Sequence, residues 1–215
     1  WWRWVLAMWL ALVTHPLLDG MTVYGTQLGL PFTDHPYGVG SVFIIDPLYT
    51  LPLLVGTLWA MRSGGTGRGL AANTAGLVLS TAYLAWGVWA QQQVTGVARA
   101  ALAAQGIVAE RLLVTPAPLN TLLWRVVAVQ GDVYHEGFRS LRDSGPGMVF
   151  DRFDRGTTLW PAVQGLDGAQ RIAAFSHGFH ALDAKGGRLH ITDLRSPSPL
   201  NDVFLDACQE QGIPF

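Results

Sequence analysis

Two long apolar runs in the first half of the chain decide the fold class. Residues 41–61 are SVFIIDPLYTLPLLVGTLWAM, and residues 70–90 are LAANTAGLVLSTAYLAWGVWA. The first run holds one charged residue, Asp46, and the second holds none. A helix needs about 20 predominantly apolar residues to cross the hydrocarbon core of a bilayer. Both runs therefore predict transmembrane helices.

The N-terminal residues form a third apolar run. Residues 1–18 are interrupted by Arg3 and by the polar pair Thr14 and His15. The tryptophans beside Arg3 are typical of a membrane interface. The two arginines of residues 62–69 predict a cytoplasmic loop, because basic residues are enriched on that side. The pattern predicts about three spans, with the residues after 90 on the periplasmic side.

Composition divides the chain into two parts. The whole sequence is 50% hydrophobic and 13% charged, whereas an average soluble domain is about 25% charged. Residues 1–90 hold three of the 14 basic residues and seven of the nine tryptophans. The net charge of −1 argues against a general nucleic-acid binder, which needs a basic surface. We predict a membrane region at residues 1–90 and a soluble domain at residues 91–215.

The second part predicts a small α+β domain with an antiparallel sheet. Residues 94–105 favour a helix that ends at Gly106. Residues 121–139 and residues 180–193 each predict a β-hairpin, with a glycine in the turn. A single cysteine, Cys208, excludes an internal disulfide framework and a zinc site built from several cysteines.

His15 and Asp19 form the first candidate for chemistry. They are four residues apart, so on a helix they share one face. An imidazole and a carboxylate at this spacing suit zinc or another divalent ion. Alternatively, the carboxylate could orient the imidazole as a base. The simpler interpretation is a polar helix end at the water boundary.

Asp46 is the second candidate. A charged residue at the centre of a membrane helix costs about 2.5–3.5 kcal/mol, so it is normally kept for a partner or a function. The alternative is that Asp46 caps a helix beginning at Pro47, and a capping carboxylate can also face a site. Tyr24 and Gln27 offer a hydroxyl and an amide to a substrate, on a segment predicted to line a polar cavity.

The remaining histidines are weaker candidates. Asp34 and His35 lie in a loop rich in proline and glycine, where solvation is their simplest role. His177 and His180 lack a third ligand at helical spacing. Asp193 and Arg195 predict an internal ion pair. Ligand roles are not predicted for the histidines of the second part, which are His135, His177, His180 and His190.

A family resemblance rests on these same residues. The block THPLLDGMTVYGTQLGLPF at residues 14–32, followed by FIIDPLYTLPLL at residues 43–54, resembles the bacterial inner-membrane family of YdjM-like metal-dependent hydrolases. Segments of the second part (PAPLNTLLWRVV, GDVYHEGFRSL, FSHGF and LHITDLR) resemble the C-terminal region of its long members. The resemblance covers nearly the whole chain.

The resemblance implies a hydrolase of the bacterial inner membrane. A divalent ion, with zinc preferred, would bind His15 and Asp19 and activate water to attack an ester or phosphoester in a lipid-like substrate. Asp46, Gln27 and Tyr24 would act as the catalytic-site residues that orient substrate or ligands. Family members carry a further membrane segment with ligand motifs that this sequence lacks, so the remaining ligands are expected from there.

A second hypothesis is a non-catalytic, membrane-anchored binding or scaffold protein. The lipid bilayer is the expected partner in both cases, and a protein partner is left open. The two hypotheses differ in where the candidate side chains are expected to point. If His15, Asp19 and Asp46 point into one cavity, the enzyme is favoured; if they face different neighbours or bulk water, the binding protein is favoured.

Overall fold

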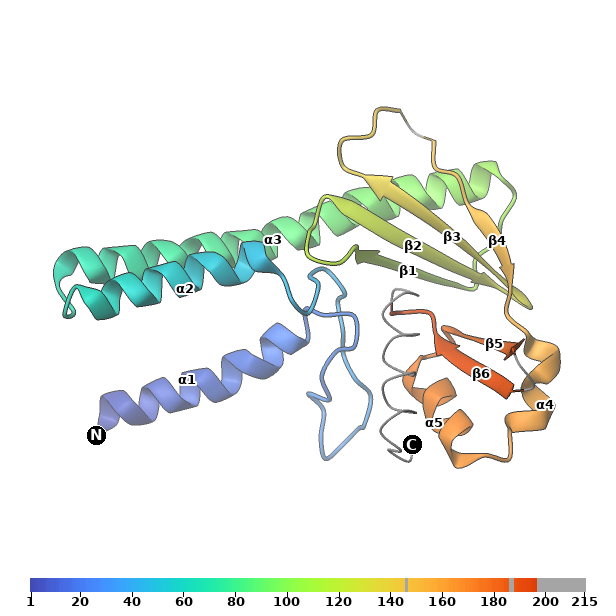
Figure 1. Ribbon diagram of the computed structural model, residues 1–215, viewed down its shortest axis with the longest axis horizontal. Coiled ribbons are helices and arrows are strands. Elements are labelled where there is room, and N and C mark those ends of the chain that lie inside the picture. Colours follow the sequence, from blue (N-terminus) through green and yellow to red (C-terminus); the bar gives the residue numbers. More distant parts are fainter. Residues whose placement is uncertain (146, 186–187, 197–215) are drawn as a thin grey trace. The chain divides into compact units, whose positions relative to one another are not determined.

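The computed structural model describes residues 1–145, 147–185 and 188–196 (Figure 1). Three helices come first, and six strands and further short helices follow. In chain order the elements are α1 (Trp2–Asp19), α2 (Pro47–Arg62), α3 (Gly67–Ala104), β1 (Arg111–Pro116), β2 (Leu123–Gln130), β3 (Val133–Ser140), β4 (Asp151–Asp154), η1 (Thr157–Leu159), α4 (Trp160–Val163), α5 (Asp167–Phe175), β5 (His180–Lys185) and β6 (Arg188–Asp193). Cys208 lies outside the described residues.

The chain forms two compact units, and each contains more than one segment. The first unit comprises Trp1–Gly96, Val114–Trp124 and Arg139–Ser144. The second unit comprises Val97–Leu113, Arg125–Phe138 and the described residues from Gly145 onward. Helix α3 continues from one unit into the other without a break, so the helices expected within 70–90 and 94–105 are one element.

The predicted region of about three membrane spans is wrong. Within the described part of the chain, no helix is both long enough and apolar enough to cross a membrane. Helix α2 shows the reason, because Asp46 caps it and it begins only at Pro47. Its 16 residues extend about 24 Å, against a hydrocarbon core of about 30 Å. Helix α1 carries the polar residues Thr14, His15 and Asp19 near its end, and polar side chains dilute the apolar residues of the long α3.

Helices α2 and α3 pack closely through glycines. A Cβ atom at Gly76 would lie 2.3 Å from the carbonyl oxygen of Pro52. One at Gly56 would lie 2.8 Å from the carbonyl oxygen of Ala72. Such distances are far below van der Waals contact, so the two backbones approach as closely as they do because these residues have no side chain.

Replacing Gly76 with alanine is expected to destabilise the protein by about 1–3 kcal/mol, the usual cost of overpacking. Gly96 in the same helix is the matched control, because nothing lies within 4 Å of a Cβ placed there. Gly96→Ala should stabilise the helix by about 0.5–1 kcal/mol. Thermal unfolding followed by circular dichroism compares the two. Equal shifts in both variants would contradict close packing at Gly76.

The segment between α1 and α2 is held by backbone hydrogen bonds. Thr26 and Tyr37 form an isolated antiparallel bridge, with backbone nitrogen-to-oxygen distances of 3.0 and 2.9 Å. Gly25 precedes the bridge with φ +72°, and a Cβ there would lie 2.6 Å from the Tyr37 carbonyl group. From α3, the side-chain amide of Gln91 donates to the carbonyl oxygens of Val39, Gly40 and Val114. The segment is therefore held by contacts within itself and with α3.

The strands form two antiparallel sheets. One has the order β1-β2-β3-β4, and the other is the β5–β6 hairpin. The hairpins predicted within residues 121–139 and 180–193 correspond to β2–β3 and β5–β6, and Gly131 turns the first with φ +55°. Residues 126–129 of β2 are almost completely buried. A small apolar core behind the β5–β6 hairpin contains Val163, Ala169 and Leu182, with Leu159, Trp160 and Ile191 packed against it.

Candidate functional site

His15 and Asp19 lie together near the end of α1. The helical period places them on the same face, and His15 Nε2 is 3.5 Å from Asp19 Oδ2. The His15 side chain is 76% exposed and the Asp19 side chain 48% exposed. The pair is thus open to solvent. The backbone just after it is anchored, because the Thr22 hydroxyl donates to the Asp19 carbonyl oxygen and Val39 N–H donates to the Gly20 carbonyl oxygen.

The geometry of this pair suits two positions of a tetrahedral metal site. Two ligand atoms about 2.1 Å from a zinc ion at the tetrahedral angle are about 3.4 Å apart. The observed separation of 3.5 Å matches this value. A catalytic zinc ion takes three protein ligands, and among the described residues no group of three or more His, Cys, Asp or Glu side chains could hold a metal ion. His15 and Asp19 therefore supply two donors, not a full ligand set.

Asp46 does not join the pair. It is 2% exposed, and its Oδ1 accepts a hydrogen bond from the Leu48 N–H at 2.9 Å, which caps α2. Its Oδ2 accepts from the hydroxyl of Tyr83, on α3, at 2.8 Å. The Thr121 hydroxyl in turn donates to the Tyr83 oxygen at 3.0 Å. Asp46 thus ends a chain of three hydrogen-bonded side chains, here called the Asp46 chain, in which Asp46 and Thr121 are buried and Tyr83 is half-buried.

The Asp46 chain affects the acidity of Tyr83. Burial raises the pKa of the Tyr83 phenol to about 12; the Thr121 hydrogen bond opposes this rise, and the Asp46 carboxylate reinforces it. The hydroxyl therefore stays protonated and keeps donating to Asp46 at neutral pH. Sequence reasoning missed Tyr83 and Thr121. The available signal was a tyrosine inside an apolar run, since a buried phenol needs a polar partner.

The two other predicted site residues lie in the loop after α1. Gln27 is exposed, and its side-chain amide donates to the Asp34 carbonyl oxygen at 2.9 Å, closing the loop. Tyr24 is half-buried just before Gly25. His35 is exposed and meets the ring of Tyr37 edge-on, with ring centroids 5.0 Å apart.

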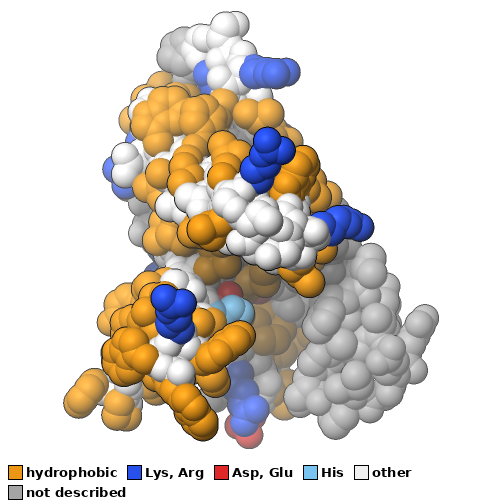
Figure 2. Space-filling view, turned by 90° about the vertical axis from the view of Figure 1, so that its left-hand side faces the viewer, with side chains coloured by type: hydrophobic (Ala, Val, Ile, Leu, Met, Phe, Trp, Pro, Cys, Tyr) orange, Lys and Arg blue, Asp and Glu red, His pale blue; other side chains and the backbone are white. Residues whose placement is uncertain are grey.

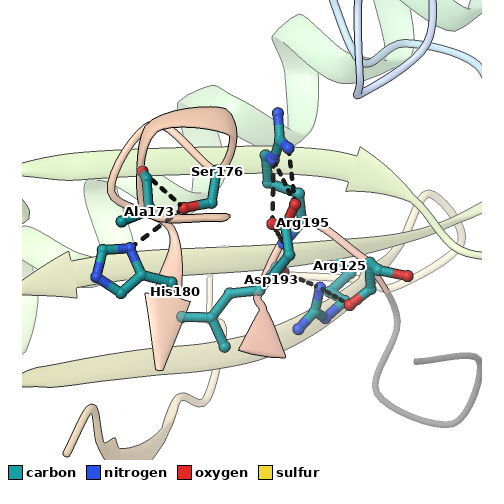
Figure 3. A network of polar contacts seen from close by, with 8 residues as sticks. Arg125, Ala173, Ser176, His180, Asp193 and Arg195 are labelled. Carbon is teal, nitrogen blue, oxygen red and sulfur yellow. Dashed lines mark hydrogen bonds and ion pairs between the residues drawn. The ribbon is translucent and has the colours of Figure 1, made fainter. Parts of the chain in front are cut away.

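The second unit holds a polar network around β5 and β6 (Figure 3). Ser176 Oγ lies 3.2 Å from His180 Nδ1 and 3.1 Å from the Ala173 carbonyl oxygen. Burial, with a contribution from Arg155, lowers the pKa of His180. A serine beside a histidine is the arrangement of an activated nucleophile, but Ser176 is completely buried. The contact therefore ties α5 to β5 rather than presenting a nucleophile to a substrate.

Asp193 and Arg195 form the predicted ion pair. Arg195 Nη2 lies 2.7 Å from Asp193 Oδ2, and the Arg195 side chain is 3% exposed. The guanidinium also lies over the ring of Phe175, 4.4 Å from its centroid. This prediction is confirmed, and the pair is a structural feature of the second unit.

Comparison with known proteins identifies a family for the N-terminal segment. Residues 1–94 match the family model described as YdjM inner membrane protein. This match confirms the resemblance noted in the sequence over those residues, and it supports a location at the membrane. No curated protein and no solved structure matches the chain. The matched segment contains His15, Asp19 and Asp46.

Proposed function

Because residues 1–94 carry the pattern of the YdjM inner membrane protein family, we propose that this membrane-associated protein is a metal-dependent hydrolase of an ester or phosphoester. The observation that carries the proposal is the exposed His15–Asp19 pair, whose two donor atoms are 3.5 Å apart. The chemistry that a divalent ion supplies at such a site is polarisation of the ester oxygen and activation of water. His15 and Asp19 would hold that ion.

Other residues of the first unit would support the pair. Tyr24 and Gln27 lie within twelve positions of His15, on the loop that follows α1, and offer polar groups to a substrate. In this proposal Asp46 contacts neither the ion nor the substrate, because its carboxylate accepts hydrogen bonds from the Leu48 N–H and the Tyr83 hydroxyl. We assign it a positioning role, in which it fixes where α2 begins and so holds the end of the loop.

The surface of α1 favours a lipid-like substrate. None of its residues is buried, and most of its side chains are large and apolar. Figure 2 shows hydrophobic side chains over much of this face of the first unit. Contiguous exposed apolar patches mark contacts with membranes, proteins or apolar ligands. The exposed apolar residues of α1 include Trp2, Trp4, Leu6, Met8, Trp9, Leu12 and Leu17.

Metal binding tests the assignment. Zinc or manganese is titrated into the purified protein, and binding is followed by calorimetry and elemental analysis. Asp19→Asn and His15→Gln are each expected to weaken binding by at least tenfold, since losing even an outer-shell partner costs roughly 10–100-fold. Asp34→Asn is the control, because this exposed carboxylate lies in the same loop region and has no assigned ligand role. Equal affinity in all four proteins would refute the metal site.

One observation favours a second candidate, a non-catalytic binding protein of the membrane. Asp46 and the His15–Asp19 pair face different neighbours, with Asp46 buried against Tyr83 and the pair open to solvent. The metal titration separates the two candidates. A protein that binds neither zinc nor manganese, while remaining folded and membrane-associated, would be the binding protein.

A further inference from the structure

We propose that the first unit binds anionic phospholipid headgroups through one end of its helices. This headgroup surface comprises Arg3, Arg62 and Arg68, with the tryptophans nearest to them. Arg3 lies in the first turn of α1, Arg62 is the last residue of α2, and Arg68 lies in the first turn of α3. The inference deepens the membrane association of the proposed function and rests on it.

Charge is separated along the helices of this unit. Within residues 1–96 the only basic residues are these three arginines, and the only acidic residues are Asp19, Asp34 and Asp46. Asp19 ends α1, which has Arg3 at its start, and Asp46 caps α2, which has Arg62 at its end. The two helices of 18 and 16 residues span about 27 and 24 Å, so each carries opposite charges at opposite ends.

The basic ends lie on the same side of the first unit. In Figure 1 the start of α1 and the turn between α2 and α3 both lie at the left-hand end. Figure 2 views this end directly and shows Lys and Arg side chains projecting beyond the orange apolar surface. All three arginines are exposed. The surface therefore presents positive charge without a neighbouring carboxylate.

Aromatic side chains make lipid the best-fitting partner. Trp1, Trp2, Trp4 and Trp59 lie close in sequence to the arginines and are between 58% and 104% exposed. Indole rings and arginines are enriched together at the headgroup level of membranes. A nucleic-acid site would need many more phosphate contacts, and the whole chain has a net charge of −1. Exposed arginines beside exposed tryptophans therefore fit the phosphodiester of a lipid headgroup at the membrane surface.

The strength of the effect can be estimated from membrane electrostatics. Each basic residue close to an anionic leaflet strengthens binding about fivefold. Three such residues together give about a 100-fold preference for anionic over neutral vesicles at low salt. Screening shortens the range of these interactions, so the preference should shrink as salt is raised.

Vesicle flotation with the full chain tests the proposal. Binding to phosphatidylcholine vesicles is compared with binding to vesicles that also contain phosphatidylglycerol. The wild type should prefer the anionic vesicles about 100-fold, and the variant R3Q/R62Q/R68Q should lose most of that preference. The control R99Q/R142Q/R171Q removes the same charge from exposed arginines elsewhere and should keep the preference. Circular dichroism verifies that each variant is folded.

Each other outcome overturns the inference. Equal binding of the wild type to both vesicles, or equal loss in the two triple variants, would show that these arginines form no headgroup surface. Displacement by inorganic phosphate, but not by chloride at the same ionic strength, would assign the site to free phosphate. Zinc binding by the wild type and both triple variants is measured in parallel. If the wild type binds zinc but shows no preference for anionic vesicles, this inference alone is refuted. If the wild type binds no vesicle at all, its membrane association is refuted as well.

Discussion

Replacing Glu136 with glutamine is expected to cost about 3–5 kcal/mol of unfolding free energy, because it leaves a buried charge without its partner. Arg125 is 5% exposed, and its Nε donates to Glu136 Oε1. Its Nη1 donates to the carbonyl oxygens of Leu194 at 2.6 Å and Ser196 at 3.3 Å. The guanidinium thus fixes the segment after β6, and carbonyl groups alone cannot neutralise it.

Urea unfolding of three variants measures this effect. The double variant Arg125→Met/Glu136→Leu removes both charges and should recover much of the loss, since apolar replacement of a buried pair is often neutral. Asp183→Asn is the control, because it breaks the Lys185–Asp183 pair, whose side chains are 78% and 54% exposed. Exposed pairs contribute about 0–1 kcal/mol. If Glu136→Gln cost no more than this control, the buried pair would not be a major source of stability.

Local sequence patterns predicted the hairpins well. The β2–β3 turn depends on Gly131, whose positive φ is easily adopted by glycine. The flanking strands follow from runs of β-branched residues that pair with their nearest neighbours in the chain. The turn glycine and the flanking strands lie within about 20 consecutive residues, so the hairpin can be predicted without contacts to distant parts of the chain.

The prediction of membrane spans was wrong because an apolar run does not show where its helix starts. Residues 41–61 are apolar enough to suggest one long helix, but Asp46 and Pro47 start the helix six residues later. The capping alternative was visible in the sequence, and the structure adopts it. Composition alone cannot distinguish a charge tolerated inside a helix from a charge that begins one.

The candidate site was predictable only in part. The proximity of His15 and Asp19 follows from the helical period alone. The Asp46 chain joins residues 37 and 38 positions apart, so it depends on how α2, α3 and the residues before β2 pack. No local pattern encodes such a contact. The sequence therefore shows Asp46 as an isolated charge and does not indicate that Tyr83 is its hydrogen-bond donor.

Replacing Asp46 with alanine is expected to destabilise the protein by about 2–4 kcal/mol. Loss of a helix cap costs about 0.5–2 kcal/mol, and a buried hydroxyl left without an acceptor costs about 1–3 kcal/mol. The hydroxyl concerned is that of Tyr83, which donates to Asp46 Oδ2 at 2.8 Å. Asp46→Asn keeps an acceptor for the Leu48 N–H and loses only the oxygen that Tyr83 uses, so it should cost distinctly less. Urea unfolding of the two variants compares these effects, and equal losses would contradict them.

Unfolding at alkaline pH gives an independent test of the environment of Tyr83 in the Asp46 chain. The pKa of Tyr83 is raised to about 12 in the folded protein, against about 10 for a free tyrosine. The unfolded chain therefore loses this proton first, and stability falls as pH rises from about 10 to about 12. Tyr83→Phe removes this titration, so its stability should decline less steeply over the same interval than that of the wild type. Parallel pH profiles of the two proteins would show that the pKa of Tyr83 is not raised in the folded protein.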